Sequence, residues 1–360
     1  MKKPIRTAVV VSLLLLPAYT AYSQPAGTPA KPYKWYFDPT IRPGPLNSPN
    51  AKKLPLITVK GNKFVDVKGD TILFRGLAIS DPDKIEGQGH WGKDHFVKVK
   101  DMGATIVRIP VHPIAWRDRT PQVYLRLLDQ AVEWCTELGM YIDLDWHSIG
   151  NLGMELFQDP SYNTTRQETY EFWRVIAWHF QGNNTIAFYE LFNEPTLFNG
   201  QLGTMSWSEW KHINENIIGV IRAYDRDKIP LVAGLDWAYD LTPLRIEPIN
   251  AQGIGYVTHP YSHKREKPYE PKWDEDFGFA AGRYPVVATE FGFAMGKEGM
   301  SENEEYGKAI ISYLERKEIS WITWVFDPEW GPRMIKSWDY TLTESGEFFK
   351  QAMQSKGKLK

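Results

Sequence analysis

Cysteine is nearly absent from this sequence of 360 residues, which contains only Cys135. One thiol cannot form an internal disulfide bond, and the sequence has no Cys/His spacing of the kind that binds structural zinc. Cys135 lies in a helix-like run at residues 132–136, where we expect a buried thiol with a structural role. Disulfides and zinc are therefore not expected to hold this fold together.

Long blocks of one charge are also missing. The chain has 42 Lys and Arg against 44 Asp and Glu, which gives a formal net charge of −2 and a pI near 6.5. This balance disfavours nucleic acid and anionic membrane surfaces as partners, and a neutral polymer or small molecule fits better. The hydrophobic content of 42% is close to the globular average, so a sizeable core is available.

No run of apolar residues is long enough for a comfortable membrane span, which needs about 20 residues. The most apolar segment, residues 8–17, follows three basic residues and precedes small residues at positions 21 and 23. This pattern predicts a signal peptide over residues 1–23, cut before Gln24. An uncleaved N-terminal anchor is the alternative. We therefore expect a secreted or periplasmic protein that has no membrane contact after cleavage.

Proline is concentrated in residues 24–55, a stretch that should be extended and poor in regular structure. Three consecutive aromatic residues at 35–37 are unusual in a free linker and indicate that part of this arm packs on the folded domain. We interpret residues 24–55 as a proline-rich arm or linker. Residues 56–355 are interpreted as one folded domain.

From residue 56 onward, strand and helix patterns alternate. A short β-hairpin is predicted over residues 57–67, and helix-like runs include residues 123–138, 165–180, 207–224 and 304–316. Strand-like runs begin near Ile72, Thr105, Tyr141, Ile186, Leu231, Ile254, Val286 and Trp321. This alternation predicts an α/β fold, a closed (β/α)8 TIM barrel rather than an open doubly wound sheet. No Gly-x-Gly-x-x-Gly follows the first strand, which disfavours dinucleotide binding.

Aromatic residues are abundant, with 15 Trp, 18 Tyr and 17 Phe. Tryptophan is costly to bury fully because its N–H needs a partner, so some tryptophans are expected to line a cleft, where flat sugar rings stack well. An aromatic-rich core is the alternative. The candidates in or near loops after strands are Trp91, Trp116, Trp146, Trp237 and Trp330, and Trp237 is favoured because it directly follows the fifth strand.

Polar and aromatic side chains lie at the ends of several predicted strands. In a (β/α)8 barrel these ends meet at one rim, where the reacting residues of such enzymes lie. Each residue alone has an ordinary structural explanation, but buried polar groups are costly unless they are paired or used. Together they predict an active site. The set comprises Arg108, His147, Asn193, Glu194, His259, Tyr261, Glu290 and Trp324.

Two members of this set, Glu194 and Glu290, suit the cleavage of a glycosidic bond. One carboxyl group must protonate the leaving oxygen while the other attacks the anomeric carbon, and retention of configuration needs them about 5 Å apart. Neighbouring negative charges raise the pKa of one carboxyl group, which keeps it protonated as the acid. Arg108 is the cation expected to keep the other carboxylate ionised.

These residues make the chain resemble glycoside hydrolase family 5, a family of endo-β-1,4-glucanases, mannanases and related enzymes. The resemblance covers about residues 56–353, and all eight strand-end positions match the family's active site in order. Its most specific piece is Asn193-Glu194-Pro195 after an apolar run. The segments at residues 145–147 and 289–292, together with Arg108, strengthen it.

The resemblance implies a role for each of these residues. Glu194 would be the acid/base and Glu290 the nucleophile. Asn193 would hydrogen-bond the sugar 2-hydroxyl. Tyr261 and Arg108 would hold Glu290 and keep it ionised.

The resemblance also implies that His147 and His259 bind the sugar at the cleavage point, in subsite −1, and tune the carboxylates, while Trp324 forms the floor under that sugar. No metal and no organic cofactor is implied. The expected function is that of a retaining endo-β-1,4-glucanase, or cellulase, which hydrolyses internal linkages of β-glucan polysaccharide or oligosaccharide by double displacement.

Two alternatives remain open at this point. The same active site would serve an endo-β-mannanase or a broad β-glucan or xyloglucan hydrolase, because cleft loops decide the substrate. A non-catalytic carbohydrate-binding barrel is the alternative of another class, although the presence of both glutamates argues against it. The sequence is silent on the preferred glycan, on endo or exo action and on oligomeric state.

Overall fold

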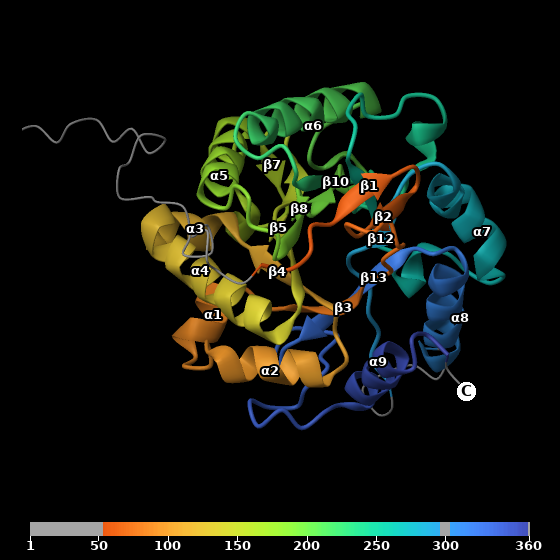
Figure 1. The fold of residues 1–360 in the computed structure, drawn as a ribbon. Helices are drawn as coiled ribbons and strands as arrows, with labels where there is room; N and C mark the ends of the chain where they lie inside the picture. The colour runs from red at the N-terminus through yellow and green to blue at the C-terminus, as the bar shows by residue number, and fades with distance from the viewer. Residues whose placement is uncertain (1–52, 296–302, 359–360) are drawn as a thin grey trace, which may run out of the picture. The chain divides into compact units, whose positions relative to one another are not determined.

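The structure, a computed structural model, describes residues 53–295 and 303–358 (Figure 1). Eight parallel strands close into a barrel in the order β10-β11-β12-β13-β3-β4-β5-β8, which confirms the predicted TIM barrel. Almost every residue of these strands is buried, as expected of parallel strands that are covered on both faces. Their bounds are Arg75–Ile79 (β3), Ile106–Val111 (β4), Tyr141–Trp146 (β5), Ile186–Glu190 (β8), Ile229–Ala233 (β10), Gly255–Thr258 (β11), Val286–Ala288 (β12) and Ser320–Phe326 (β13).

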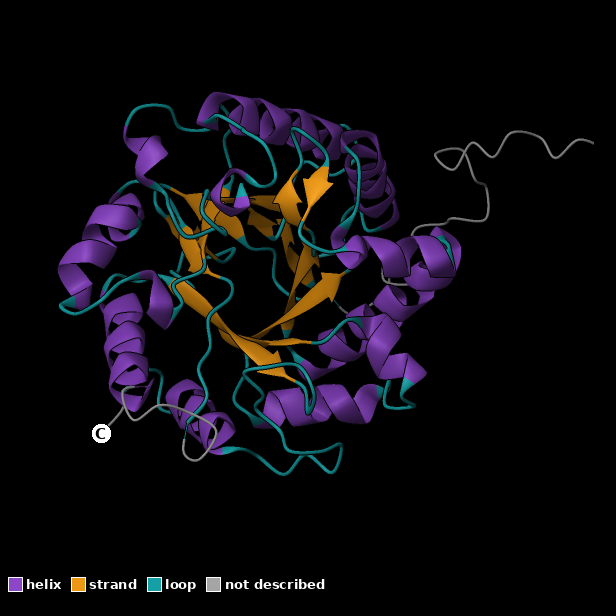
Figure 2. Cartoon of the chain, turned by 180° about the vertical axis from the view of Figure 1, so that it is seen from behind, coloured by secondary structure: helices purple, strands orange, loops and turns teal. Residues whose placement is uncertain are grey.

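Helices surround the barrel (Figure 2). They are α1 (Pro82–Gly87), α2 (Lys93–Asp101), α3 (Pro113–Arg119), α4 (Pro121–Leu138), α5 (Arg166–His179), α6 (Trp207–Arg222), α7 (Tyr269–Asp276), α8 (Asn303–Arg316) and α9 (Glu344–Gln354). Helix α6 illustrates why they form. It begins with a capping box in which the Ser206 hydroxyl accepts from the Glu209 backbone N–H and the Glu209 carboxylate accepts from the Ser206 backbone N–H. Its buried residues, such as Ile213, Ile217 and Ile221, recur at helical spacing on one face.

A β-hairpin covers the end of the barrel at which the strands begin. Strands β1 (Thr58–Lys60) and β2 (Lys63–Val65) pair antiparallel, which confirms the predicted hairpin. The ring of Phe64 packs on Phe188 of β8 with the centroids 4.7 Å apart, and on Phe74 just before β3 at 6.4 Å. Because apolar rings fill this end, the opposite rim is the end available to a ligand.

A second small sheet lies outside the barrel. Strand β6 (Ile149–Asn151) pairs with β7 (Leu156–Phe157) on one side and with β9 (Glu194–Pro195) on the other. Gly150 allows the close approach of β7, since a Cβ atom at this position would lie 2.5 Å from the Leu156 carbonyl oxygen. The sheet joins the segment after β5 to the segment after β8.

Short 3-10 helices occupy several of the loops. They are η3 (Pro160–Tyr162), η4 (Phe198–Gly200), η5 (Thr242–Arg245), η6 (Ser262–Lys264) and η7 (Gly278–Gly282). None of the helices in the described ranges combines the length and apolar character needed to cross a bilayer.

The predicted elements agree with the observed ones to within a few residues. The largest shift among the strand starts is at β3, which begins at Arg75 rather than near Ile72, because Thr71 forms a bridge with Val65 of the hairpin. Cys135 is a buried free thiol, as predicted. The predicted signal peptide, and the proline-rich arm up to residue 52, lie outside the described residues.

The last residues of the arm, 53–55, are described and lie against the barrel. The Leu54 carbonyl oxygen accepts a hydrogen bond from the Asn184 side chain, and the Pro55 carbonyl oxygen accepts one from the Tyr141 hydroxyl, both at 2.9 Å.

Candidate active site

The eight strand-end residues predicted from the sequence gather at the rim opposite the hairpin. They come from six different strands or from the segments that directly follow them. The set comprises Arg108 in β4, His147 after β5, Asn193 and Glu194 after β8, His259 and Tyr261 after β11, Glu290 after β12 and Trp324 in β13. Because the barrel strands are parallel, residues far apart in the sequence reach one site.

Arg108 is the centre of this cluster and is completely buried. Its guanidinium donates to both carboxylate oxygens of Glu190 at 2.8 and 2.9 Å, to Glu290 at 2.8 Å and to the Asn193 carbonyl at 2.6 Å, and it lies 3.0 Å from Asp145. Burial opposes its charge, but the surrounding carboxylates outweigh that effect and raise the pKa of Arg108 well above its usual value. The cation is therefore permanent, and its planar fork fixes several acceptors at once.

Both oxygens of Glu290 are held. One accepts from Arg108, and the other accepts from the Tyr261 hydroxyl at 2.8 Å. Burial and the charges of Glu290 and Glu194 raise the pKa of Tyr261 well above its usual value, so this phenol remains a donor. The two donors together fix the orientation of the Glu290 carboxylate.

Glu194 has a different environment. Burial raises the pKa of its carboxyl group, its hydrogen bond with His259 at 3.0 Å opposes that shift, and the nearby Glu290 adds to it. Burial also opposes the charge of His259, but Glu290, Glu190 and Glu194 together raise the pKa of its imidazole to about 9. A carboxyl group with a raised pKa beside a cationic imidazole is suited to donate and recover a proton.

The distances within this site limit its chemistry. One oxygen of Glu194, one oxygen of Glu290 and one ring nitrogen of His259 all lie within 4.8 Å of one another. Such a triad has the composition of a metal site, yet His259 uses one nitrogen towards Glu194 and the other towards the Thr289 hydroxyl, 3.0 Å away. The imidazole is committed to hydrogen bonds on both sides, so the triad fits proton transfer better than metal ligation.

Asn193 is positioned as a free donor beside the glutamates. Its carbonyl oxygen accepts from Arg108, so its amide nitrogen points elsewhere. Among the described residues, this buried nitrogen has no hydrogen-bond partner. An unpaired buried N–H costs free energy, which a bound hydroxyl group would recover.

His147 and Trp324 form one wall of the site. The two rings are stacked, with an angle of 3° between their planes and their centroids 5.3 Å apart. His147 is hydrogen-bonded to Asp145 through Nδ1 at 2.6 Å. Burial, together with the charges of His112 and Arg108, lowers the pKa of His147 well below its usual value, so this imidazole is neutral.

Trp237, the favoured outer platform, lies half-buried after β10 and beside the segment that carries Glu194. Its backbone N–H donates to the Pro195 carbonyl at 3.1 Å, and the Lys264 ammonium lies 4.8 Å from its ring centroid. It is therefore adjacent to the cluster rather than part of it.

Of the other four candidate tryptophans, three pack against neighbouring side chains and one borders a cavity. Trp116 and Trp146 are buried, and Trp146 stacks on Phe172 in the core. Trp91 packs on Phe96 and Trp134. Trp330 lies 6.0 Å from Trp324 and borders an open cavity.

Three residues of the site lie within the strand-end segments but were given no role by the sequence analysis: Glu190, Asp145 and Thr289. Glu190 binds Arg108, accepts from the Thr289 hydroxyl at 3.1 Å, and lies 3.6 Å from His259. Arg108 and the hydrogen bond from His259 outweigh burial and lower the pKa of Glu190 to about 2. The available signal was a carboxylate inside an otherwise apolar strand.

Comparison with known proteins gives a consistent result. A family model described as Cellulase (glycosyl hydrolase family 5) matches residues 65–329. The structure is similar to that of a β-glucanase from Saccharophagus degradans, with 43% identity and a TM-score of 0.85 over 91% of this chain and 100% of that chain. The same β-glucanase has been solved in complex with cellotetraose.

Curated relatives include Endoglucanase E-5 of Thermobifida fusca and Endoglucanase CelA of Streptomyces lividans. The first is 24% identical over 302 residues, which is 81% of this chain and 59% of that protein. The second is 27% identical over 252 residues, which is 65% of this chain and 50% of that protein. The chain thus spans only half to three fifths of the length of these relatives.

Proposed function

Because the chain belongs to glycosyl hydrolase family 5, we propose that it is a retaining endo-β-1,4-glucanase, with Glu194 as the acid/base and Glu290 as the nucleophile. The observation that carries the assignment is the pair of carboxyl groups, whose oxygens approach within 4.8 Å. Retaining glycosidases need a separation of about 5–5.5 Å, whereas inverting enzymes leave room for a water molecule between the two groups.

The different environments of the two glutamates support the division of roles. Arg108 and Tyr261 hold both oxygens of Glu290, so its carboxylate is aimed at one point and is suited to attack the anomeric carbon. Glu194 has a raised pKa and therefore retains a proton for the leaving oxygen. In the second step, Glu194 accepts a proton from the water molecule that hydrolyses the glycosyl-enzyme.

Further contacts support binding of a sugar beside these carboxyl groups. The unpaired amide nitrogen of Asn193 is placed to donate to the 2-hydroxyl, a contact that strengthens as positive charge develops on the ring. Trp324 and the neutral His147 provide the floor and a hydrogen-bonding wall. A glucan substrate is also supported by the cellotetraose complex of the similar β-glucanase.

The test compares wild type, Glu194→Gln and Glu290→Gln on carboxymethylcellulose, mixed-linkage β-glucan, glucomannan and xylan. Either substitution should lower kcat by about a thousandfold or more. Glu270→Gln is the matched control, because Glu270 forms an exposed ion pair with Arg316 in α8. Preference for glucomannan over the glucans would instead support a mannanase, and wild type without activity on any polymer would support a binding protein.

Azide rescue separates the two roles. In Glu194→Ala, azide attacks the covalent intermediate and should give a β-glycosyl azide. In Glu290→Ala, azide takes the place of the missing carboxylate and should give an α-glycosyl azide. Nuclear magnetic resonance of the products distinguishes them, and exchanged configurations would reverse the assignment.

We also propose that the chain is exported, with cleavage before Gln24. The support is the basic, apolar and small-residue pattern of residues 1–23. N-terminal sequencing of the protein recovered outside the cytoplasm should begin at Gln24, and recovery of the intact N-terminus would contradict cleavage.

A further inference from the structure

A carboxyl group that has no part in the mechanism described above lies inside the barrel. Asp143 is in the middle of β5 and is completely buried. It is in register with Arg108 of β4 on one side and with Phe188 of β8 on the other. Because side chains alternate along a strand, Asp143 points to the same face as Asp145, which lies 3.0 Å from Arg108. Asp143 therefore faces the barrel interior, one layer further from the rim than Asp145.

Asp143 lacks the donors that a buried carboxylate needs. Among the buried carboxyl groups of the residues that the structure describes, only Asp143 has no hydrogen-bond partner at either oxygen. None of the hydrogen bonds that the Arg108 guanidinium donates reaches Asp143. An ionised carboxylate that is buried without donors is so costly that such a group takes up a proton instead.

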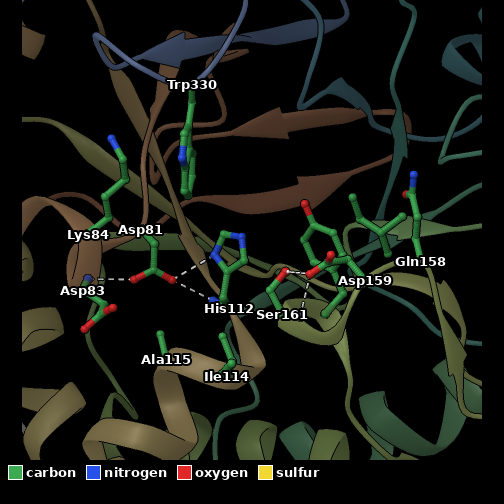
Figure 3. Close-up of a pocket in the computed structure, with 12 residues that line it drawn as sticks. Asp81, Asp83, Lys84, His112, Ile114, Ala115, Gln158, Asp159, Ser161 and Trp330 are labelled. Carbon is green, nitrogen blue, oxygen red and sulfur yellow. Dashed lines mark hydrogen bonds and ion pairs between the residues drawn. The ribbon is translucent and has the colours of Figure 1, made fainter.

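Asp81, a buried acid at the rim, shows the contrast. Asp81 and His112 line the open cavity that Trp330 borders, and each oxygen of the Asp81 carboxylate has a donor (Figure 3). One oxygen accepts from the His112 backbone N–H at 2.8 Å. The other accepts from the Asp83 backbone N–H and from the Tyr124 hydroxyl, both at 2.7 Å. Donors of this kind stabilise the charged form of a buried carboxyl group, and the described residues around the centre of β5 offer no counterpart.

The charges of the catalytic cluster also disfavour another anion at this position. The charged and titratable groups of the cluster come from β5, β4, β8, β11 and β12 or from the segments that follow them: Asp145, His147, Arg108, Glu190, Glu194, His259 and Glu290. Four of these groups are carboxyl groups, and only Arg108 and His259 are cations. An ionised Asp143 would add to an existing excess of negative charge.

We propose that Asp143 is a neutral carboxylic acid whose hydroxyl donates to Glu190, and that this hydrogen bond positions Glu190 as the carboxylate that holds Arg108. Asp143 is thus a positioning residue and not a catalytic residue. The inference rests on the proposed glucanase function only for its effect on turnover, because the proton on Asp143 is a property of the protein without substrate.

Glu190 has an acceptor site available for this hydrogen bond. One of its oxygens accepts from Arg108 at 2.9 Å and from the Thr289 hydroxyl at 3.1 Å. The other oxygen accepts at 2.8 Å from Arg108, its only donor among the described residues, so it has a lone pair left for the Asp143 proton. Burial raises the pKa of Asp143 well above its usual value, and the charge of Glu190 and a hydrogen bond with it add to the shift. That hydrogen bond exists only if Asp143 carries the proton, since two carboxylates have no donor between them.

The consequence is a chain of hydrogen bonds from the barrel interior to the nucleophile. Asp143 donates to Glu190, which accepts from Arg108 through both oxygens. Arg108 in turn donates to Glu290 at 2.8 Å. A neutral donor holds Glu190 in place without adding negative charge, so the cation of Arg108 remains shared between Glu190 and the nucleophile. A second carboxylate in the layer below would compete for that cation.

Kinetics of two variants of the full chain test the positioning role. Asp143→Leu keeps a branched side chain of similar shape and removes the donor, whereas Asp143→Asn is always neutral and offers an amide N–H in its place. We expect Asp143→Leu to lower kcat/KM on β-glucan about tenfold, mainly through kcat, and Asp143→Asn to recover most of that loss. Both limbs of the pH profile of kcat/KM should keep their wild-type positions in Asp143→Asn. Asp225→Leu is the matched control, because Asp225 is a buried acid that lies 3.8 Å from Lys228 at the base, and it should lower stability alone.

Infrared spectroscopy at pH 7 tests the proton directly and needs no substrate, because the carbonyl band of a protonated carboxyl group is separate from the bands of a carboxylate. Glu194→Gln serves as the background, since Glu194 is the catalytic acid and is itself expected to be protonated. A protonated-carboxyl band should remain in Glu194→Gln and should lose intensity in the double variant that adds Asp143→Asn.

The outcomes separate this inference from the proposed function. A Glu194→Gln protein without any protonated-carboxyl band would overturn the inference, even if the Asp143 variants did not fold, and an equal band in the double variant would do the same. Full activity in Asp143→Leu, or displaced pH limbs in Asp143→Asn, would overturn the positioning role. A wild type that cleaves no polymer but loses the band on Asp143→Asn substitution would overturn the glucanase proposal and leave the neutral Asp143 in place.

Discussion

The barrel buries charge at both of its ends, but in different ways. At the rim, Arg108 binds Glu190 and Glu290 and lies 3.0 Å from Asp145. At the base, the Lys228 ammonium donates to the backbone carbonyls of Asn183 and Ile186. At the rim, the single positive charge of Arg108 lies among three carboxylates. At the base, Lys228 is bound mainly by backbone carbonyl groups, which are dipoles without a net charge.

The pKa values reflect this difference. At the rim, neighbouring charges move the pKa values of two groups in opposite directions: the pKa of Glu190 falls to about 2, and that of His259 rises to about 9. At the base, burial lowers the pKa of Lys228 to about 8, although Asp225 and Asp227 oppose the shift. In this barrel the groups suited to proton transfer lie within the cluster of charges at the rim, whereas Lys228 lies at the opposite end.

Outside the catalytic pair, the largest effect should come from Glu190→Gln, which removes one anion from the rim. His259 loses a negative charge 3.6 Å away, so its imidazole gives up its proton at lower pH. A neutral His259 no longer opposes the raised pKa of Glu194, and the acid form of Glu194 survives to higher pH. We expect kcat/KM to fall on the order of a hundredfold and its alkaline limb to move to higher pH.

Glu315→Gln is the matched control for this prediction. Glu315 also binds an arginine through both oxygens, since Arg75 donates to it at 2.6 and 2.7 Å, but Arg75 is the first residue of β3 and lies at the base. The control should lower stability and leave the pH profile of kcat/KM unchanged. A loss of activity in Glu190→Gln without any shift of the alkaline limb would show that Glu190 acts through Arg108 alone.

A smaller effect is expected from Trp237→Ala, which removes an aromatic ring beside the rim but no charged group. Trp237 lies beside the segment of Glu194, where the leaving part of a glucan binds in the proposed mechanism. The KM for cellopentaose should rise about tenfold, more than the KM for nitrophenyl cellobioside, and the pH profile should keep its shape. Equal losses on both substrates would contradict a role in binding the leaving sugars.

The smallest effect on activity should come from Lys228→Met at the base. Below pH 8 the folded wild type carries a buried charge, and between pH 8 and 10.5 the folded protein has released this proton while the unfolded chain still binds it. Stability therefore rises with pH across this window in wild type relative to the variant. Urea denaturation at pH 7 and 10 measures the difference, and a constant difference in unfolding free energy would show that Lys228 titrates normally when folded.

The sequence predicted the barrel and the eight strand-end residues because six of the eight apolar runs end on a polar or aromatic side chain. It did not predict Glu190 or Asp145, since the direction of a side chain inside a parallel strand depends on the register. The structure pairs these two positions across β5 and β8. The residues of the cavity were also beyond reach as a group, because His112 and Trp330 meet only when the barrel closes.

The pairing of β6 with β9 has a consequence for protein engineering. The backbone N–H of Glu194 donates to the Ser148 carbonyl at 3.1 Å, and that of Thr196 donates to the Gly150 carbonyl at 3.0 Å. The loop after β5 is thus part of the scaffold that carries the proton donor, besides shaping the cleft. A chimera that exchanges this loop to change substrate range must transplant residues 148–151 together with their partner segment, or it will alter the turnover rate as well as the specificity.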